Sequence, residues 1–307
     1  MDTRSRIPVG PPISSPLPSY WHNPKSPLAK TQEPSTDSPT TPYTHLIIGS
    51  GISGTMIAFN IFRSSPSAHI AMLEAREICS GATGRNGGHT KAASYLSYVG
   101  HVRELGKQEA LKIARLEYAN IVKTHALAGE LGIECENAVC KTVDVVYDRD
   151  AFEHGKRAVK MLREDMNEEE RGEGKAGWYR VYEEVEEVKR KFFVAGKNEN
   201  ATVKEEEKVV DGTQHIIMGG GLGRLPANGL SEYGTVDDSR LNTENTAYLR
   251  ETCTGYFGTA NWGEKSAEEA EQPVVQEWTG IMGATSDERP FCWPSAWEEG
   301  LVDICGL

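Results

Sequence analysis

Short apolar runs and longer amphipathic stretches alternate along the first half of the chain. The run from Leu46 to Ile48 is uncharged and mostly β-branched, which predicts a strand buried on both faces of a parallel sheet. Residues 55–62 are almost wholly apolar and are followed by Pro66, so they predict a helix that ends there. Residues 69–73 predict a second strand. Strand, helix and strand in this order indicate an α/β fold.

Helical periodicity is clearest in residues 101–131. Leucine, isoleucine and valine recur there at helical spacing among charged residues, and Gly132 is placed to cap the C-terminus. We expect further helices over residues 150–170 and 181–191, and a polar loop followed by a helix within residues 232–257.

Three later stretches predict strands, namely residues 139–146, 214–218 and 274–282. The first of them is expected to begin a β-rich domain. The second follows the hairpin signal Asp211-Gly212 and precedes a glycine cluster. That cluster lacks the Gly-Lys-Ser/Thr ending of a nucleotide P-loop, which excludes this alternative.

The glycines after the first strand have the spacing of a dinucleotide-binding loop. Gly49, Gly51 and Gly54 form G-x-G-x-x-G, and the helix that follows would direct its N-terminal amides at a pyrophosphate. Glu74 closes the second strand, 25 residues after Gly49, where a carboxylate binds an adenosine ribose. A carboxylate would repel a 2′-phosphate, so we expect an adenine dinucleotide without one.

A second glycine-rich loop, residues 79–89, follows the second strand directly. Ser80, Thr83 and Asn86 offer hydrogen-bond donors, and Arg85 adds a positive charge. Glycine in such a loop lets backbone amides point at an anion. The loop therefore predicts a second contact with a phosphate or a ribityl chain.

Residues 49–54, 73–76 and 79–88 together resemble the N-terminal FAD-binding signature of the D-amino-acid oxidase-like (DAO) family of FAD-dependent oxidoreductases. The resemblance implies an FAD cofactor and oxidation of a C–N bond of an amine or amino acid by hydride transfer to flavin. Dioxygen is the electron acceptor that it implies. The cofactor-binding residues expected from the motifs are Gly49, Ser50, Gly51, Ile52, Ser53, Gly54, Glu74, Ala75, Arg76, Ser80, Thr83, Gly84, Arg85, Asn86, Gly87, Gly88 and His89. No catalytic side chain can be named from the sequence.

The expected architecture is a Rossmann-like FAD-binding domain with a mixed, largely antiparallel β-rich substrate domain. Its expected parts are a Pro-rich disordered N-terminal extension (1–43), the FAD-binding domain (44–135), an incomplete substrate domain (136–280) with a charged insert (164–210), and a truncated return toward the FAD domain (281–307). An internal segment and the C-terminal FAD-binding segment of the family are not recognisable. An inactive or fragmentary relative and a non-catalytic dinucleotide-binding module therefore stay open as alternatives.

One aromatic patch interrupts the polar N-terminal region. Tyr20 and Trp21 lie between Ser19 and His22, and aromatic side chains in such a segment are expected to dock onto the folded body. Two interpretations remain open: the segment packs on the core, or it reaches the mouth of the active site.

Charge and cysteine content narrow the classes of ligand. A net charge of −12 argues against nucleic acid or an anionic membrane as partner, because both require a basic face, and favours a small-molecule ligand. The six cysteines show no C-x-x-C pair and no zinc spacing, so no metal site is expected. No apolar run has the length of a membrane span, and we expect a cytoplasmic protein.

Overall fold

The computed structural model describes residues 7–8, 10–30, 42–194, 216–258, 274–283, 291–294 and 302–305. The chain divides into two compact units. Unit 1 consists of Met1–Gly87, Ile217–Arg250 and Ser266–Leu307, and unit 2 consists of Gly88–Ile216 and Glu251–Lys265. The domain limits expected from the sequence remain a prediction, because this division into compact units does not test them. Among the described residues, none of the helices combines the length and the apolar character needed to cross a bilayer.

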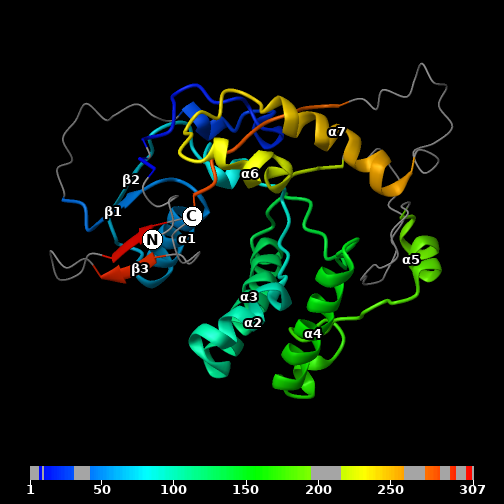
Figure 1. Ribbon diagram of the computed structural model, residues 1–307. Coiled ribbons are helices and arrows are strands. Elements are labelled where there is room, and N and C mark those ends of the chain that lie inside the picture. Colours follow the sequence, from blue (N-terminus) through cyan, green and yellow to red (C-terminus); the bar gives the residue numbers. More distant parts are fainter. Residues whose placement is uncertain are drawn as a thin grey trace. The chain divides into compact units, whose positions relative to one another are not determined.

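Unit 1 contains the expected strand, helix and strand. These are β1 (His45–Ile48), α1 (Ile52–Ser64) and β2 (Ile70–Leu73), shown in Figure 1. The two strands pair in parallel, with His45 opposite Ile70 and Ile48 opposite Leu73. Parallel pairing places the ends of both strands at the same edge, where the two glycine-rich loops begin.

The prediction that the first strand is buried on both faces is wrong. Ile47 is 7% exposed, but Leu46 is 61% and Ile48 is 83% exposed. The reason is that this sheet has only two strands among the described residues. A strand loses its exposure on both faces only when further strands and helices cover it.

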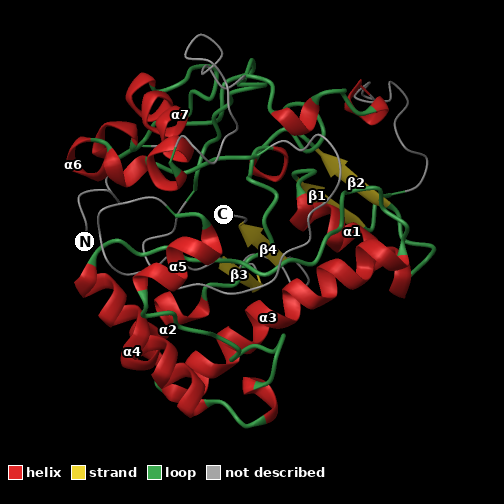
Figure 2. Ribbon diagram, turned by 90° about the vertical axis from the view of Figure 1, so that its right-hand side faces the viewer, coloured by secondary structure: helices red, strands yellow, loops and turns green. Residues whose placement is uncertain are grey.

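The remaining elements of unit 1 are short, apart from the helix α7 (Thr243–Phe257), which continues into unit 2. Helical turns are η2 (Tyr20–His22), η3 (Pro27–Lys30), η4 (Ala82–Gly84), η6 (Leu222–Arg224), α6 (Pro226–Gly229) and η7 (Leu230–Glu232). A separate antiparallel pair consists of β3 (Phe291–Pro294) and β4 (Val302–Cys305), visible in Figure 2.

Two further expected strands, at 214–218 and 274–282, are not formed by their described residues. Residues 216–218 and 274–282 carry no ladder hydrogen bonds to another described segment. Residues 211–215 lie outside the described residues. An apolar alternating segment becomes a strand only when a partner strand lies beside it, and sequence pattern does not supply that partner.

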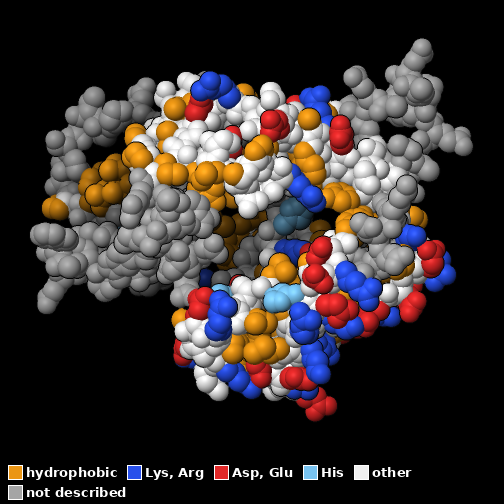
Figure 3. Space-filling view, in the orientation of Figure 1, with side chains coloured by type: hydrophobic (Ala, Val, Ile, Leu, Met, Phe, Trp, Pro, Cys, Tyr) orange, Lys and Arg blue, Asp and Glu red, His pale blue; other side chains and the backbone are white. Residues whose placement is uncertain are grey.

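Unit 2 is helical. Its elements are α2 (Ser94–Leu105), α3 (Lys107–Glu130), α4 (Arg149–Asp165), η5 (Glu169–Arg171) and α5 (Val185–Phe192). The helices α2, α3 and α4 share one core, made by Tyr95, Tyr98, Ala110, Leu111, Ala114, Ala158, Val159, Leu162 and Met166. Acidic and basic side chains mix on the surface of these helices (Figure 3). Amphipathic helices that bury one face against each other explain this core.

The single helix predicted over residues 101–131 is wrong, because the chain breaks at Gly106. This glycine has φ +82° and ψ 160°, a conformation available almost only to glycine, and it separates α2 from α3. The cap at Gly132 is confirmed. The Ile133 amide donates to the Ala128 carbonyl (2.9 Å) and the Gly132 amide to the Gly129 carbonyl (3.2 Å), which is a Schellman motif.

The predicted helix at 150–170 is confirmed but shorter, since α4 ends at Asp165. Its N-terminus is capped by Asp148, whose Oδ1 accepts from the Ala151 amide at 2.7 Å. The strand expected at 139–146 is wrong: apart from a single β-bridge at Asp144 these residues form no strand, and Val139 is 87% exposed. The expected antiparallel β-rich substrate domain is therefore not formed by the described residues of unit 2.

Candidate cofactor-binding site

The three glycines at the junction of β1 and α1 each fit a different feature of the geometry. Gly49 has φ +98°, which lets the chain turn sharply at the end of the strand. A Cβ on Gly54 would lie 2.1 Å from the Gly49 carbonyl oxygen and 3.1 Å from Ile47 Cγ2. A Cβ on Gly51 would lie 3.0 Å from Thr83 Oγ1. Sharp turn, close backbone approach and close helix packing are the three roles of glycine in a dinucleotide-binding loop.

The N-terminus of α1 presents backbone amides beside this loop. The Ile52 amide donates to Thr83 Oγ1 at 2.9 Å. Within the described part of the chain, the amides of Ser53 and Gly54 have no acceptor, because the first amides of a helix have no partner inside it. Amides in this position, together with the helix dipole, attract an anion such as a pyrophosphate.

Glu74 lies at the end of β2 and turns its carboxylate toward the first loop. Its Oε2 accepts from the Ser50 amide (2.9 Å) and the Ser50 hydroxyl (2.5 Å), and Oε1 accepts from the Arg76 amide (3.1 Å). Burial by itself would raise the pKa of Glu74, but these hydrogen bonds and one from the Ala75 amide together lower it. The half-buried carboxylate is therefore ionised at neutral pH, with lone pairs left for a hydroxyl group.

Ser50 also joins the first loop to the second. Its hydroxyl accepts from the Cys79 amide at 3.0 Å, and its carbonyl accepts from Cys79 Sγ at 3.0 Å. Burial, followed by the charge of Glu74, raises the pKa of the Cys79 thiol, so the thiol stays protonated at neutral pH. The two glycine-rich loops are thus tied together by Ser50 at the edge of the parallel strands.

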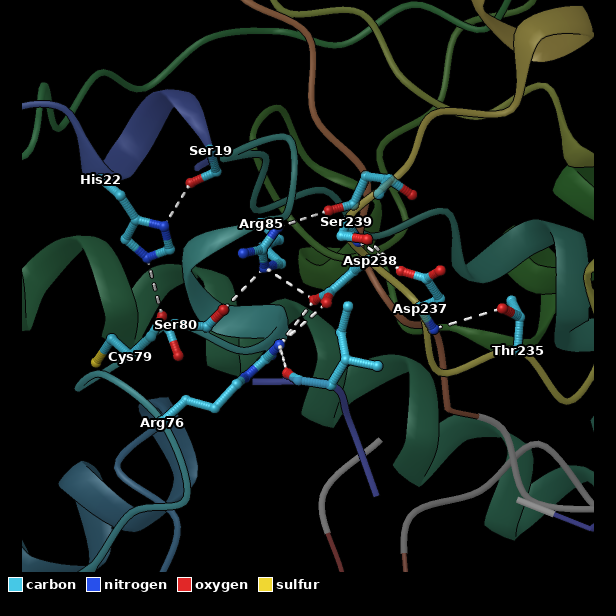
Figure 4. Close-up of polar contacts among 12 residues, drawn as sticks. Ser19, His22, Arg76, Cys79, Ser80, Arg85, Thr235, Asp237, Asp238 and Ser239 are labelled. Atoms are coloured by element: carbon cyan, nitrogen blue, oxygen red, sulfur yellow. Dashed lines mark hydrogen bonds and ion pairs between the residues drawn. The ribbon is translucent and has the colours of Figure 1, made fainter. Parts of the chain in front are cut away.

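A buried charge cluster lies behind the second loop (Figure 4). Arg85 donates through Nε to the Ser80 carbonyl and through Nη1 to the Thr279 carbonyl, each at 2.8 Å. Its Nε lies 3.4 Å from Asp238 Oδ2, and Arg76 Nη1 lies 3.0 Å from the same oxygen. The Arg85 guanidinium, expected to face an anion, is therefore engaged within the protein. Two arginines around one carboxylate leave one net positive charge in the cluster.

The N-terminal aromatic patch docks onto the second loop, as expected. The buried Ser19 hydroxyl donates to the Gly84 carbonyl, and Trp21 Nε1 donates to the Asn86 carbonyl at 2.7 Å. His22 Nδ1 lies 3.0 Å from Ser19 Oγ, and Figure 4 shows the His22 ring beside the loop. The interpretation that the segment packs on the core is confirmed. That it reaches the mouth of an active site stays a prediction.

A third segment reaches the same loop from the C-terminal part of unit 1. Trp278 Nε1 donates to the Arg85 carbonyl at 2.9 Å. The Tyr20 and Trp278 rings stack with centroids 6.4 Å apart, and Gln276 Nε2 donates to the Pro18 carbonyl at 2.8 Å. Residues 18–22 and residues 276–279 therefore contact both the second loop and each other.

The structure brings most of the residues predicted for the site together in unit 1. Gly49 to Gly54, Glu74 to Arg76 and Ser80 to Gly87 lie in the two loops and the strand end just described, while Gly88 and His89 are exposed at the start of unit 2. Sequence reasoning missed Asp238 and Trp278. No pattern in the polar loop around Asp238 indicated that this residue would be part of the site. Trp278 could have been noticed as an aromatic residue in an apolar stretch. No group of potential metal ligands occurs among the described residues.

Comparison with known proteins agrees with this geometry. Residues 45–191 match the model of the DAO family, described as FAD dependent oxidoreductase. Searches of curated proteins and of solved structures gave no match. The matched range includes β1, α1, β2 and both glycine-rich loops, together with α2 to α4 and all but the last residue of α5. Residues 45–191 are therefore similar to the FAD-dependent oxidoreductase family, whose members bind FAD.

Proposed function

We propose that the protein binds FAD in this cradle and uses it to oxidise a C–N bond of a small amine or amino acid. The observation that carries the proposal is the set of three glycines, each required by a different close approach or turn, beside an ionised carboxylate at the end of the neighbouring strand. The family match supports a flavin oxidoreductase with a small-molecule substrate. The amine or amino-acid class rests on the resemblance of the three motifs.

The residues of the cradle fit the ADP half of FAD. The amides of Ser53 and Gly54 at the N-terminus of α1, which have no acceptor among the described residues, are suited to hold the pyrophosphate. Glu74 is suited to accept hydrogen bonds from the ribose, since its carboxylate is charged and half exposed. A Cβ on Gly51 would make a tight contact of 3.0 Å with Thr83 Oγ1, so glycine at this position leaves space beside these amides for a ligand.

The chemistry divides between cofactor and protein. When bound, FAD supplies the hydride acceptor, and dioxygen is the proposed final electron acceptor. The protein binds and orients the cofactor through the two loops. The buried cluster of Arg76, Arg85 and Asp238 keeps one net positive charge behind the second loop, which favours the anionic part of a dinucleotide.

Anaerobic reduction tests the proposed reaction. Purified protein loaded with FAD is mixed without oxygen with a panel of primary amines, N-methylated amines and amino acids, and the visible absorbance of the oxidised flavin is followed. At least one of these classes is expected to bleach the flavin, and 2-hydroxy acids serve as matched non-amine controls. Flavin that stays oxidised with every amine would reject the oxidase and assign the protein as a dinucleotide-binding module.

A further inference from the structure

A cavity of about 550 Å³ lies within unit 1. One of its walls comes from residues 225–231, and the other comes from residues 242–244 at the start of α7. None of the described residues that line it belongs to the two glycine-rich loops. Its volume is within the range of cavities that hold small organic ligands. The cavity is therefore a candidate binding site separate from the cofactor cradle.

The first wall offers apolar side chains to a ligand. These side chains are Leu225, Pro226, Ala227 and Leu230. Leu225 is only 7% exposed, whereas Leu230 is 49% exposed. The buried leucine anchors the wall in the protein. The exposed leucine would gain from an apolar ligand group that removes it from water.

The same wall contains two consecutive residues in the left-handed backbone conformation. Ala227 has φ 51° and Asn228 has φ 55°. This region is unfavourable for L-residues other than glycine, although asparagine tolerates it better than alanine does. Backbone strain of this kind clusters at active sites and ligand clamps. It is a second observation, independent of the cavity itself, that marks this wall as a binding surface.

The second wall is polar and carries a negative charge. Asn242 Nδ2 donates to Glu232 Oε1 at 2.8 Å, and Asn242 Oδ1 accepts from the Asn245 amide at 2.9 Å. These contacts fix the orientation of the Asn242 side chain. Glu244 is exposed, and it is the only ionisable side chain among the described residues that line the cavity. Apolar side chains together with a carboxylate favour a ligand that has an apolar group and a positive charge.

The start of α7 raises the opposite possibility, because a helix N-terminus attracts anions. Its effect is equivalent to about half a positive charge. The Glu244 carboxylate lies in the first turn of α7, and the Glu232 carboxylate binds the Asn242 side chain. Two carboxylates outweigh half a positive charge, so the cavity attracts a cation rather than an anion.

We propose that this cavity binds a small organic cation with an apolar group, of which an alkylammonium ion is the simplest example. The apolar group contacts Leu230 and its neighbours in the first wall, and the ammonium group pairs with the Glu244 carboxylate. The inference does not depend on FAD binding, because no residue of the cradle takes part in it.

Titration calorimetry on the full chain with three matched probes tests the proposal. Pentylammonium, pentan-1-ol and pentanoate have the same carbon chain and differ in charge. Pentylammonium is expected to bind saturably with a Kd of about 1 mM, as is reasonable for so small a ligand. Pentan-1-ol is expected to bind about fivefold more weakly, since it lacks the charge, and pentanoate is expected not to bind.

Two substitutions locate the binding in this cavity. Glu244→Gln keeps the size of the side chain but removes its charge, and it is expected to weaken pentylammonium binding about fivefold while pentan-1-ol stays within about twofold of wild type. Leu230→Ala is expected to weaken binding of both probes. Glu251→Gln is the matched control, because it removes the same charge farther along the same helix, outside the cavity, and it is expected to change neither affinity.

Absence of saturable pentylammonium binding by the wild-type protein would overturn the proposal. Tighter binding of pentanoate than of pentylammonium would overturn it as well and would assign the cavity to anions. An equal loss of pentylammonium affinity in Glu244→Gln and Glu251→Gln would show an effect of net charge alone and contradict the assigned site. Glu244 and Glu251 are exposed, so both variants are expected to fold. If Glu244→Gln does not fold, wild-type pentylammonium affinity in Leu230→Ala refutes the proposal.

Discussion

Arg76 and Asp238 are 162 positions apart in the sequence, yet Arg76 Nη1 lies 3.0 Å from Asp238 Oδ2 in an almost fully buried ion pair. The same carboxylate faces Arg85 of the second glycine-rich loop at 3.4 Å. Asp238 therefore joins the polar loop before α7 to both sides of the candidate cofactor site. Because both arginines pair with this one carboxylate, removing it would leave their buried charges uncompensated and lower the stability of the protein.

Replacing Asp238 with alanine is expected to destabilise the protein strongly. The substitution leaves two buried or nearly buried arginines without their carboxylate, and breaking a buried pair in this way costs about 3–5 kcal/mol. Urea denaturation of wild type and variant measures the difference. The same variant is expected to bind FAD more weakly, because Arg85 anchors the second loop.

Asp237→Ala is the matched control, one residue away. Asp237 accepts from the hydroxyl of Ser239 and pairs with the exposed Arg240, and neither contact involves the cofactor loops. We expect a much smaller loss of stability and unchanged FAD affinity. Equal losses in the two variants would show that the position in the loop, rather than the buried cluster, carries the effect.

The stability provided by Glu74 is expected to depend on pH. Its pKa is lowered in the folded protein, so its contribution is complete above the pKa of the unfolded chain, about 4.3, and is lost as pH falls through the folded value. Glu74→Gln should therefore reduce the free energy of unfolding by about 1 kcal/mol at pH 7, because an amide NH₂ meets the donors of Ser50. The difference from wild type should shrink below about pH 4. A stability difference between Glu74→Gln and wild type that increases at acidic pH would contradict this prediction.

Gly54→Ala tests the close packing of α1 on the first loop. The added Cβ would lie 2.1 Å from the Gly49 carbonyl oxygen, so the helix must shift, at a cost of about 1–3 kcal/mol. Gly100→Ala in α2 is the control, since nothing lies within 4 Å of its added Cβ. Alanine there should stabilise the protein by about 0.5–1 kcal/mol. Thermal unfolding of both variants checks the opposite signs.

Gly106→Ala tests the break between α2 and α3. An alanine at φ +82° and ψ 160° is expected to cost about 1–3 kcal/mol of stability. Denaturation monitored by circular dichroism measures this cost. A variant as stable as wild type with increased helix content would mean that the two helices join into the one that the sequence pattern predicts.

Features that depend on neighbours in sequence could be predicted, and features that depend on distant partners could not. The turn at Gly49, the start of α1 and the cap at Gly132 follow from local glycine chemistry, and all three are formed. Val139 lies in an apolar alternating segment, but whether such a segment becomes a strand depends on a partner elsewhere in the chain.

The same limit applies to the candidate site. The residue types of the second loop indicated anion binding, and Arg85 was expected to supply its charge to that anion. Instead, the Arg85 guanidinium forms an ion pair with Asp238, which lies far along the chain. Local sequence gives the donors of a loop, but the long-range ion pair decides which of them face outward.

The most direct test of the central claim is a titration of FAD on purified wild-type protein and on Gly51→Val, followed by flavin fluorescence and visible absorbance. The account predicts saturable binding by wild type and little or no binding by the variant, whose added side chain would enter the space beside Thr83 Oγ1. A thermal unfolding curve close to that of wild type would show that the variant is folded. Wild-type protein without affinity for FAD, or a folded Gly51→Val variant with wild-type affinity, would contradict the account.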